Sequence, residues 1–224
     1  MNDLIFIITA DGSKTIFDPG NGEHYHSING ALQESKHVFL ESGLRHFLKQ
    51  SNHRVVSVLE VGFGTGLNFL LTAQYAIDHH LSLHYTGIEA YPLSPDMIRE
   101  SGYSKYISRE VWDLFLAKYE QALQRETLFS PFIHWEVVRQ KMAAFETGKQ
   151  FDLLYFDAFS SVSQPEMWTR EALSGVCRHL KTGGLFVTYA MNGNLKRSMQ
   201  ALGFRLEKIP GASGKREMGR ATKL

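Results

Sequence analysis

The sequence has a single cysteine in 224 residues, so no disulfide can form within the chain. This usage is typical of a reducing compartment, and we expect a cytoplasmic protein in which Cys177 is a packed core thiol. No uninterrupted apolar run approaches the roughly 20 residues that a membrane helix needs. The first eight residues also lack the basic start of a secretory signal. We therefore expect no membrane partner.

An overall charge excess is also missing, because the formal net charge is only +1. The charge is unevenly distributed, however: residues Leu195 to Leu224 include eight Lys and Arg but only two Glu. This segment is either a solvated basic face or a surface that binds anions such as a phosphate backbone. The charge count alone leaves both interpretations open.

The ten histidines do not form a Cys/His cluster in the sequence, and we expect no metal site. Four of them stand as close pairs, His24 with His26 and His79 with His80. We interpret these two pairs as loop and surface residues.

Strand-like and helix-like segments alternate through most of the chain, which predicts an α/β fold with a mostly parallel sheet covered on both faces. The expected strands of this seven-stranded sheet are residues 55–60, 83–89, 133–138, 151–157, 185–189, 204–209 and 217–222. The expected helices cover residues 32–50, 68–79, 142–147, 165–180 and 194–202. Only a short segment joins the last two strands, so they form a terminal antiparallel hairpin.

Two further segments complete the predicted organisation. The segments 4–8 and 14–17 flank an Asp–Gly turn, which predicts a small N-terminal β-hairpin extension, and residues 18–31 read as a loop. Residues 92–130 read as a mostly helical insertion. We expect residues 1–224 to form one domain, with 1–31 as its extension.

A glycine-rich stretch, Glu60 to Asn68, follows the first strand of the predicted sheet and precedes a helix. Its pattern is G-x-G-x-G after an acid, not the G-x-G-x-x-G of nicotinamide sites. Glycines allow a sharp turn and a close approach of a ligand to the backbone. An acid there suits S-adenosylmethionine (AdoMet) better than a pyrophosphate. The alternative is a tight turn without a ligand.

Three acids, Glu60, Glu89 and Asp157, each end a different predicted strand, and ligands bind at the carboxyl ends of such strands. Glu89 follows the glycine stretch at the distance in sequence at which an acid can accept hydrogen bonds from ribose hydroxyls. Asp157 is suited to methyl transfer to an amine, because a carboxylate orients an N–H and stabilises the charge that develops on nitrogen. The aromatic side chains of Tyr155, Phe159 and Trp168 are candidate walls for a flat substrate, or else core residues.

Several segments together resemble one family, the bacterial tRNA (5-aminomethyl-2-thiouridine) methyltransferases, which occur alone (MnmD type) or as the N-terminal half of bifunctional MnmC proteins. The matching segments are Thr9–Ser13, Gly30–Ser35 with Val38–Leu40, Glu60–Leu70, Tyr155–Phe159 with Gln164–Trp168, Thr188–Tyr189 with Lys196–Arg197, and Gly203–Phe204 with Gly211–Met218. The resemblance implies a Rossmann-like class I AdoMet-dependent methyltransferase that acts on the wobble uridine of tRNA. No flavin is expected, since the flavin-dependent half is not in this sequence.

The resemblance implies that Asp157 lies at the methyl-transfer centre and that Glu60, the three glycines and Glu89 hold AdoMet. Positions in the sequence add the other candidates. Candidate cofactor contacts are Glu60, Gly62, Phe63, Gly64, Thr65, Gly66, Asn68, Glu89 and Gln140; candidate substrate contacts are Phe159, Tyr189, Lys215 and Arg216. Where the family carries a Gly–Asp pair at the end of the third core strand, this chain reads Arg139 to Met142. Adenine contacts are therefore expected from backbone or from Gln140.

Two other functions are compatible with these residues. One is methyl or aminopropyl transfer to a small amine, which also uses acids at strand ends and needs no basic face. The other is a catalytically silent, methyltransferase-like module that binds RNA.

Overall fold

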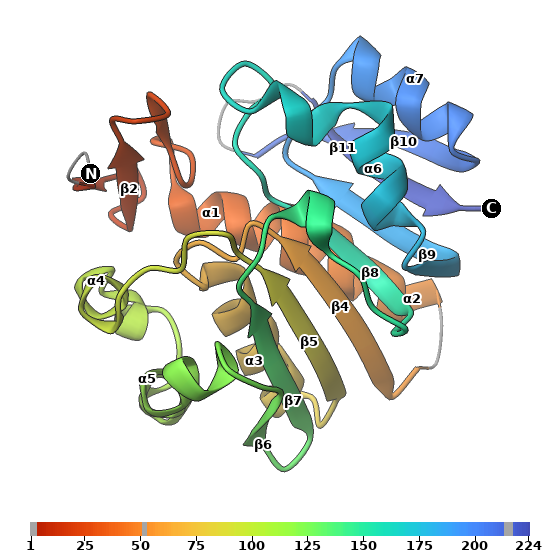
Figure 1. Ribbon diagram of the computed structural model, residues 1–224. Coiled ribbons are helices and arrows are strands. Elements are labelled where there is room, and N and C mark those ends of the chain that lie inside the picture. The colour runs from red at the N-terminus through yellow and green to blue at the C-terminus, as the bar shows by residue number, and fades with distance from the viewer. Residues whose placement is uncertain (1–3, 51–52, 213–216) are drawn as a thin grey trace.

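The computed structural model describes residues 4–50, 53–212 and 217–224, and its centre is a twisted sheet of eight strands (Figure 1). Across the sheet the strands are β10 (Phe204–Pro210), β11 (Glu217–Lys223), β9 (Leu180–Thr188), β8 (Phe151–Phe156), β4 (Val55–Val61), β5 (Ser82–Ile88), β7 (Ile133–Val138) and β6 (Thr127–Ser130).

The five central strands, from β9 to β7, are parallel, and β11 runs antiparallel to both of its neighbours. The mostly parallel sheet and its terminal antiparallel hairpin are thus confirmed. The predicted count of seven strands was one too low, because β6 adds an antiparallel edge strand beside β7. This strand lies within residues 92–130, which we interpreted as mostly helical.

Helices cover both faces of the sheet, as the near-continuous apolar strands require (Figure 1). One face packs against a helical run made of α1 (Ala31–Ser35), a π-helical segment (Lys36–Arg45) and α2 (His46–Gln50), together with α3 (Leu67–Asp78) and α5 (Arg109–Ala122). The other face packs against α6 (Arg170–Cys177), α7 (Gly193–Ala201) and the short 3₁₀ turns Met142–Ala144 and Pro165–Trp168. The helix α4 (Pro95–Glu100) and a 3₁₀ turn (Tyr103–Lys105) lead into α5.

The N-terminal extension is a separate three-stranded antiparallel sheet of β1 (Ile5–Ile8), β2 (Lys14–Asp18) and β3 (Glu23–His24). The predicted hairpin is present, and β3 adds a short strand in the segment that we interpreted as a loop.

The Asp11 carboxylate fastens this extension to the helical run that begins at α1. It accepts hydrogen bonds from Thr9 and from the backbone N–H of Gln33, at 2.8 and 2.9 Å. A Cβ added to Gly30 would lie 2.7 Å from a carboxylate oxygen of Asp11, so this position needs a glycine. Two of the segments that carried the family resemblance, near residues 11 and 30, thus meet in one helix-capping contact.

Cys177 is buried against the apolar core of α6, as predicted. Within the described part of the chain, no helix has both the length and the apolar character needed to cross a membrane.

Candidate active site

The glycine loop lies where β4 turns into α3, beside the carboxyl end of β8. Gly62 has a φ of +85°, and a Cβ added there would lie only 2.4 Å from the backbone oxygen of Asp157. The backbone N–H of Asp157 in turn donates to the carbonyl of Val61 at 2.9 Å. Because only glycine permits this conformation and approach, the sequence of the loop fixes Asp157 directly beside it.

The side chain of Asn68, on the first turn of α3, bridges two of the predicted acids. Its Nδ2 donates to Glu60 at 2.9 Å and to Asp157 at 2.8 Å. The acceptor atom of the amide, Oδ1, is buried and has no hydrogen-bond partner among the described residues. The structure therefore brings Glu60, Asn68 and Asp157 into one hydrogen-bonded group at the start of α3.

Glu60 is the most deeply buried member of this group. Its side chain has no exposed surface, and its second oxygen accepts a hydrogen bond from Tyr85 at 2.8 Å. Burial raises the pKa of Glu60 well above its ordinary value, although the bonds from Asn68 and Tyr85 oppose this shift. The sequence placed Glu60 at the strand end facing a ligand; the structure places it beneath Asn68, on the face of β4 that packs against α3.

His26 was missed as a site residue. It follows β3, and its ring is buried between the glycine loop and Asp157, with Nε2 3.0 Å from the Thr65 hydroxyl and Nδ1 3.9 Å from Asp157 Oδ2. Tyr103 donates to the same Thr65 hydroxyl at 3.2 Å. His26 lies in a loop, as expected, but our interpretation of it as a surface residue was wrong, because the extension folds over the carboxyl end of the sheet. His79 and His80, by contrast, are exposed as expected.

The rim next to this group is formed by Glu89, Gln140 and Tyr25. Glu89 follows β5 and accepts a hydrogen bond from the backbone N–H of Gly64 at 2.9 Å. The backbone N–H groups of Glu89 and Gln140 share the Val138 carbonyl, at 3.1 and 3.0 Å, so these two predicted residues lie together. Tyr25 lies against Gly64, where an added Cβ would be 3.1 Å from its ring. Burial, and then the charge of Glu89, raise the pKa of Tyr25.

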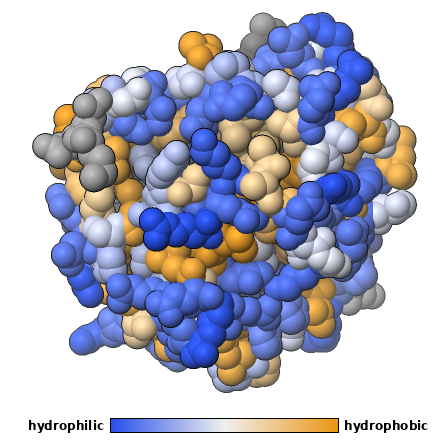
Figure 2. Space-filling view, in the orientation of Figure 1, coloured by the Kyte–Doolittle hydropathy of each residue, from blue (hydrophilic) through white to orange (hydrophobic). Residues whose placement is uncertain are grey.

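Aromatic side chains continue the site on the side of β8. Phe159 packs edge-on against Tyr25, with ring centroids 5.2 Å apart. Tyr189 donates its hydroxyl to the Ala158 carbonyl at 2.9 Å, and burial followed by the charge of Asp157 raises the pKa of that hydroxyl. The two predicted substrate residues, Phe159 and Tyr189, therefore lie close together at the loop that follows β8. The face seen in Figure 2 has hydrophobic residues near its centre and mostly hydrophilic ones around them.

Not every predicted residue reaches the site. The Phe63 side chain is buried in the aromatic core against Trp135, and its backbone N–H donates to Ile88, so it shapes the loop from below. Tyr155 is likewise a fully buried core residue. Lys215 and Arg216 lie outside the described residues.

The basic C-terminal segment is partly neutralised by its own hairpin. Lys208 pairs with Glu217 and Arg220 pairs with Glu207, at 2.7 and 2.6 Å. Lys223 donates to carbonyl groups at the end of α6 and the start of β9. These three cations therefore have structural partners, which reduces the charge left for an anionic ligand.

A glycine turn between a parallel strand and a buried helix, with acids at the ends of neighbouring strands, defines a Rossmann-like AdoMet-dependent methyltransferase. Residues 107–224 match the family model described as S-adenosyl-L-methionine-dependent methyltransferase, and the chain belongs to this family.

Curated relatives are longer proteins. The chain is 30% identical over 205 residues to the tRNA 5-methylaminomethyl-2-thiouridine biosynthesis bifunctional protein MnmC of Leptospira interrogans, covering 87% of this chain and 31% of that protein. The MnmC protein of Idiomarina loihiensis is 28% identical over 226 residues, covering 92% and 36%. The chain thus spans about a third of the length of these relatives.

Solved structures agree with the fold. The crystal structure of MNMC2 from Aquifex aeolicus superposes with a TM-score of 0.79 at 25% identity, covering all of this chain and 71% of that one. A putative class I S-adenosylmethionine-dependent methyltransferase from Listeria monocytogenes has a TM-score of 0.51 at 12% identity, covering 88% and 62%, which shows a shared fold only.

Proposed function

We propose that the chain is an N-methyltransferase that converts 5-aminomethyl(-2-thio)uridine at the tRNA wobble position into the 5-methylaminomethyl form, in the cytoplasm. The observation that carries this proposal is the position of Asp157, held beside the glycine loop by Asn68 and flanked by His26. The similarity to the MnmC proteins, which covers most of this chain, supports the tRNA substrate.

The residues present suit AdoMet on two observations. A Cβ added at Gly62 would crowd the backbone of Asp157, and one added at Gly64 would crowd the ring of Tyr25. The loop beside Asp157 therefore exposes backbone without side chains at these two positions. The buried Oδ1 of Asn68 is an unpaired acceptor that a donor such as an ammonium group would satisfy. We propose that the glycine loop, Asn68, Glu89 and Gln140 hold the cofactor, with Glu60 and Thr65 supporting them from beneath.

AdoMet supplies, when bound, a methyl group activated by a sulfonium. The task of the chain is then to hold a neutral amine and to stabilise the positive charge that develops on its nitrogen. The Asp157 carboxylate is suited to accept a hydrogen bond from the amine N–H. Asn68 donates to Asp157 Oδ2, and His26 Nδ1 lies 3.9 Å from the same oxygen, so these two side chains fix the carboxylate.

The base of the target uridine would be held by the aromatic wall of Phe159 and Tyr189. We propose further that Lys215 and Arg216 contact tRNA phosphates. In this proposal residues 1–224 act as one methyltransferase domain. The extension 1–31 is then part of the active site, because Tyr25 and His26 lie against the glycine loop and Asp157.

The direct experiment is a transfer assay with labelled AdoMet and tRNA from a strain blocked after 5-aminomethyluridine formation. The proposal predicts label in that tRNA and none in tRNA that lacks the aminomethyl group. Transfer to a polyamine but not to tRNA would support the small-amine alternative. Binding of AdoMet without any transfer would support a silent RNA-binding module.

A further inference from the structure

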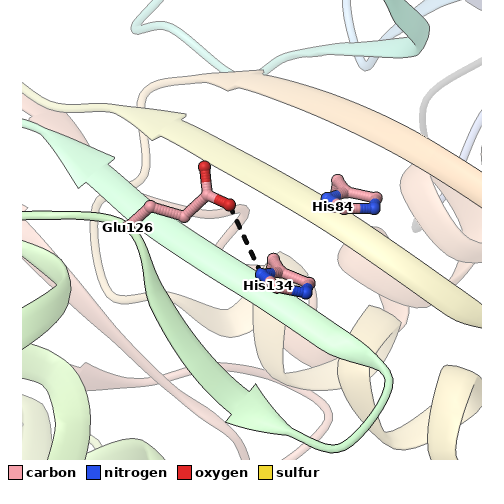
Figure 3. Close-up of side chains that lie close together, drawn as sticks. All are labelled: His84, Glu126 and His134. Atoms are coloured by element: carbon pink, nitrogen blue, oxygen red, sulfur yellow. Dashed lines mark ion pairs between the residues drawn. The ribbon is translucent and has the colours of Figure 1, made fainter.

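Two histidines and a glutamate from separate parts of the sequence meet on the sheet, away from the site described above (Figure 3). They are His84 on β5, His134 on β7 and Glu126, which immediately precedes β6. One ligand atom from each lies within 4.8 Å of the others. Within the described part of the chain, this is the only group of three or more His, Cys, Asp or Glu side chains with such spacing.

The strand register creates the cluster. His84 and His134 are direct partners on two parallel strands, and their rings stack with centroids 4.9 Å apart and planes 11° apart. The antiparallel edge strand brings Glu126 alongside, with its Oε1 3.4 Å from His134 Nδ1. The sequence did not indicate this pair, because residues 50 positions apart become neighbours only through the strand register.

The carboxylate of Glu126 is oriented by a neighbouring cation. Its Oε2 accepts a hydrogen bond from Lys149 at 2.5 Å, while its other oxygen, Oε1, faces His134. Lys149 also donates to Glu136 at 2.7 Å, and Glu136 accepts a bond from Thr86 at 2.9 Å. One oxygen of Glu126 is thus held by a fixed network and the other is directed to the imidazoles, as in metal sites with ordered outer ligands.

The cluster offers two imidazole nitrogens and one carboxylate oxygen as ligand atoms.

We propose that His84, His134 and Glu126 bind one zinc ion, with water at the fourth position. Two imidazoles and one carboxylate are a common donor set for zinc, whose ligand atoms in a tetrahedral site lie about 3.3 Å apart. The pair His134 and Glu126 already has this separation, and the ligand atom of His84 lies within 4.8 Å of both. Bound zinc would join the three strands β5, β7 and β6 at the edge of the sheet.

This site is separate from methyl transfer. His84 and His134 lie near the starts of their strands, whereas Glu89 and Asp157 follow the ends of theirs. Zinc binding can therefore be measured without AdoMet or tRNA, and its outcome is independent of the proposed function.

The test uses the full chain, freed of metal with a chelator and titrated with zinc chloride by calorimetry. Absorption of cobalt(II) provides a second readout of tetrahedral coordination. We expect one zinc per chain, and a melting temperature higher by roughly 5–10 °C when free zinc exceeds the dissociation constant about a hundredfold. The variants His84→Gln, His134→Gln and Glu126→Gln should each weaken binding at least about tenfold.

His53→Gln is the matched control, because His53 is exposed and stacks on Phe47 outside the cluster. It should bind zinc as the wild type does. Circular dichroism of every variant confirms that the fold is retained. The proposal is overturned by zinc binding below one equivalent, or by equal affinity in the wild type and the His84→Gln and His134→Gln variants.

Discussion

At the scale of single residues, Asn68 joins the two acids of the site, since one amide group donates to both Glu60 and Asp157. Glu60 is held in turn by Tyr85. The Asp157 side chain is 8% exposed, whereas Glu60 is completely buried in the core. In the proposed function the two acids therefore have different tasks, Asp157 at the substrate and Glu60 in support.

Replacing Asp157 separates catalysis from cofactor binding. We expect Asp157→Ala to lower the single-turnover rate of methyl transfer by about 100-fold or more, because the carboxylate that stabilises the charged nitrogen is lost. AdoMet affinity, measured by calorimetry, should change little. Asp96→Ala, at an exposed aspartate paired with Arg99, is the control and should retain the wild-type rate. A parallel loss of rate and AdoMet affinity would assign Asp157 to the cofactor instead.

Glu60 gives a prediction about stability and pH. Its pKa is raised in the folded state, so its contribution to stability is complete below its ordinary pKa of about 4.5 and is lost as the pH rises towards the folded value. Glu60→Gln cannot ionise and keeps an oxygen for Asn68. The stability of this variant relative to the wild type should therefore increase between pH 5 and pH 8, as measured by urea unfolding. A difference that stays constant over this range would show that Glu60 is ionised in the fold.

The sequence revealed some of these roles but not others. The glycine loop, Asp157 and Glu89 could be predicted because each follows a strongly apolar strand. The inward direction of Glu60 was available from the alternation in β4, since it shares a face with Val58, but we placed it by its position at the strand end. His26 could not be predicted, because nothing local in a Gly- and Asn-rich segment indicates contact with a residue 131 positions away.

At the scale of elements, the N-terminal sheet is attached to the active-site loop as well as to α1. Glu23 on β3 accepts hydrogen bonds from the backbone N–H of Ser160, at 2.9 Å, and from the Ser160 hydroxyl. These bonds hold the pKa of Glu23 below its ordinary value although burial opposes the shift. The extension thus fixes both His26 and the loop that follows Asp157.

Removing this attachment should loosen the extension locally. For Glu23→Ala we expect a loss of about 1–2 kcal/mol of local stability, since hydrogen bonds to a charged group are removed. Amide hydrogen exchange at Ser160 and in β3 should become faster, while exchange in the central strand β4 stays unchanged. Unchanged exchange at Ser160 would show that other contacts hold the extension in place.

Element prediction succeeded where the pattern was long and failed where it was short. The parallel strands and the terminal hairpin followed from apolar runs and from the length of the connection between them. The edge strand β6 has four residues and begins a short turn after the end of α5, so it is too short to show an alternating pattern. The two-residue strand β3 is defined only by its pairing with β2.

At the scale of the whole molecule, the near-neutral net charge means that the proposed tRNA contact would be local. Two cations of the C-terminal hairpin, Lys208 and Arg220, pair with glutamates, and Lys215 and Arg216 stay our predicted phosphate contacts. Replacing both with Ala should weaken tRNA binding and reduce the slope of log affinity against log salt by about 1–2. Lys208→Ala is the control on the same hairpin and should alter the slope less, because Lys208 already pairs with Glu217. An equal slope in the double variant and the wild type would assign the two residues to the solvated surface.

The most direct test of the account is nucleoside analysis of tRNA carrying 5-aminomethyluridine after a single turnover with purified protein and AdoMet. The account predicts 5-methylaminomethyluridine at the wobble position with the wild-type chain and the unchanged aminomethyl nucleoside with Asp157→Ala. Unchanged 5-aminomethyluridine with the wild type, or the same yield of the methylated nucleoside from both proteins, would contradict it.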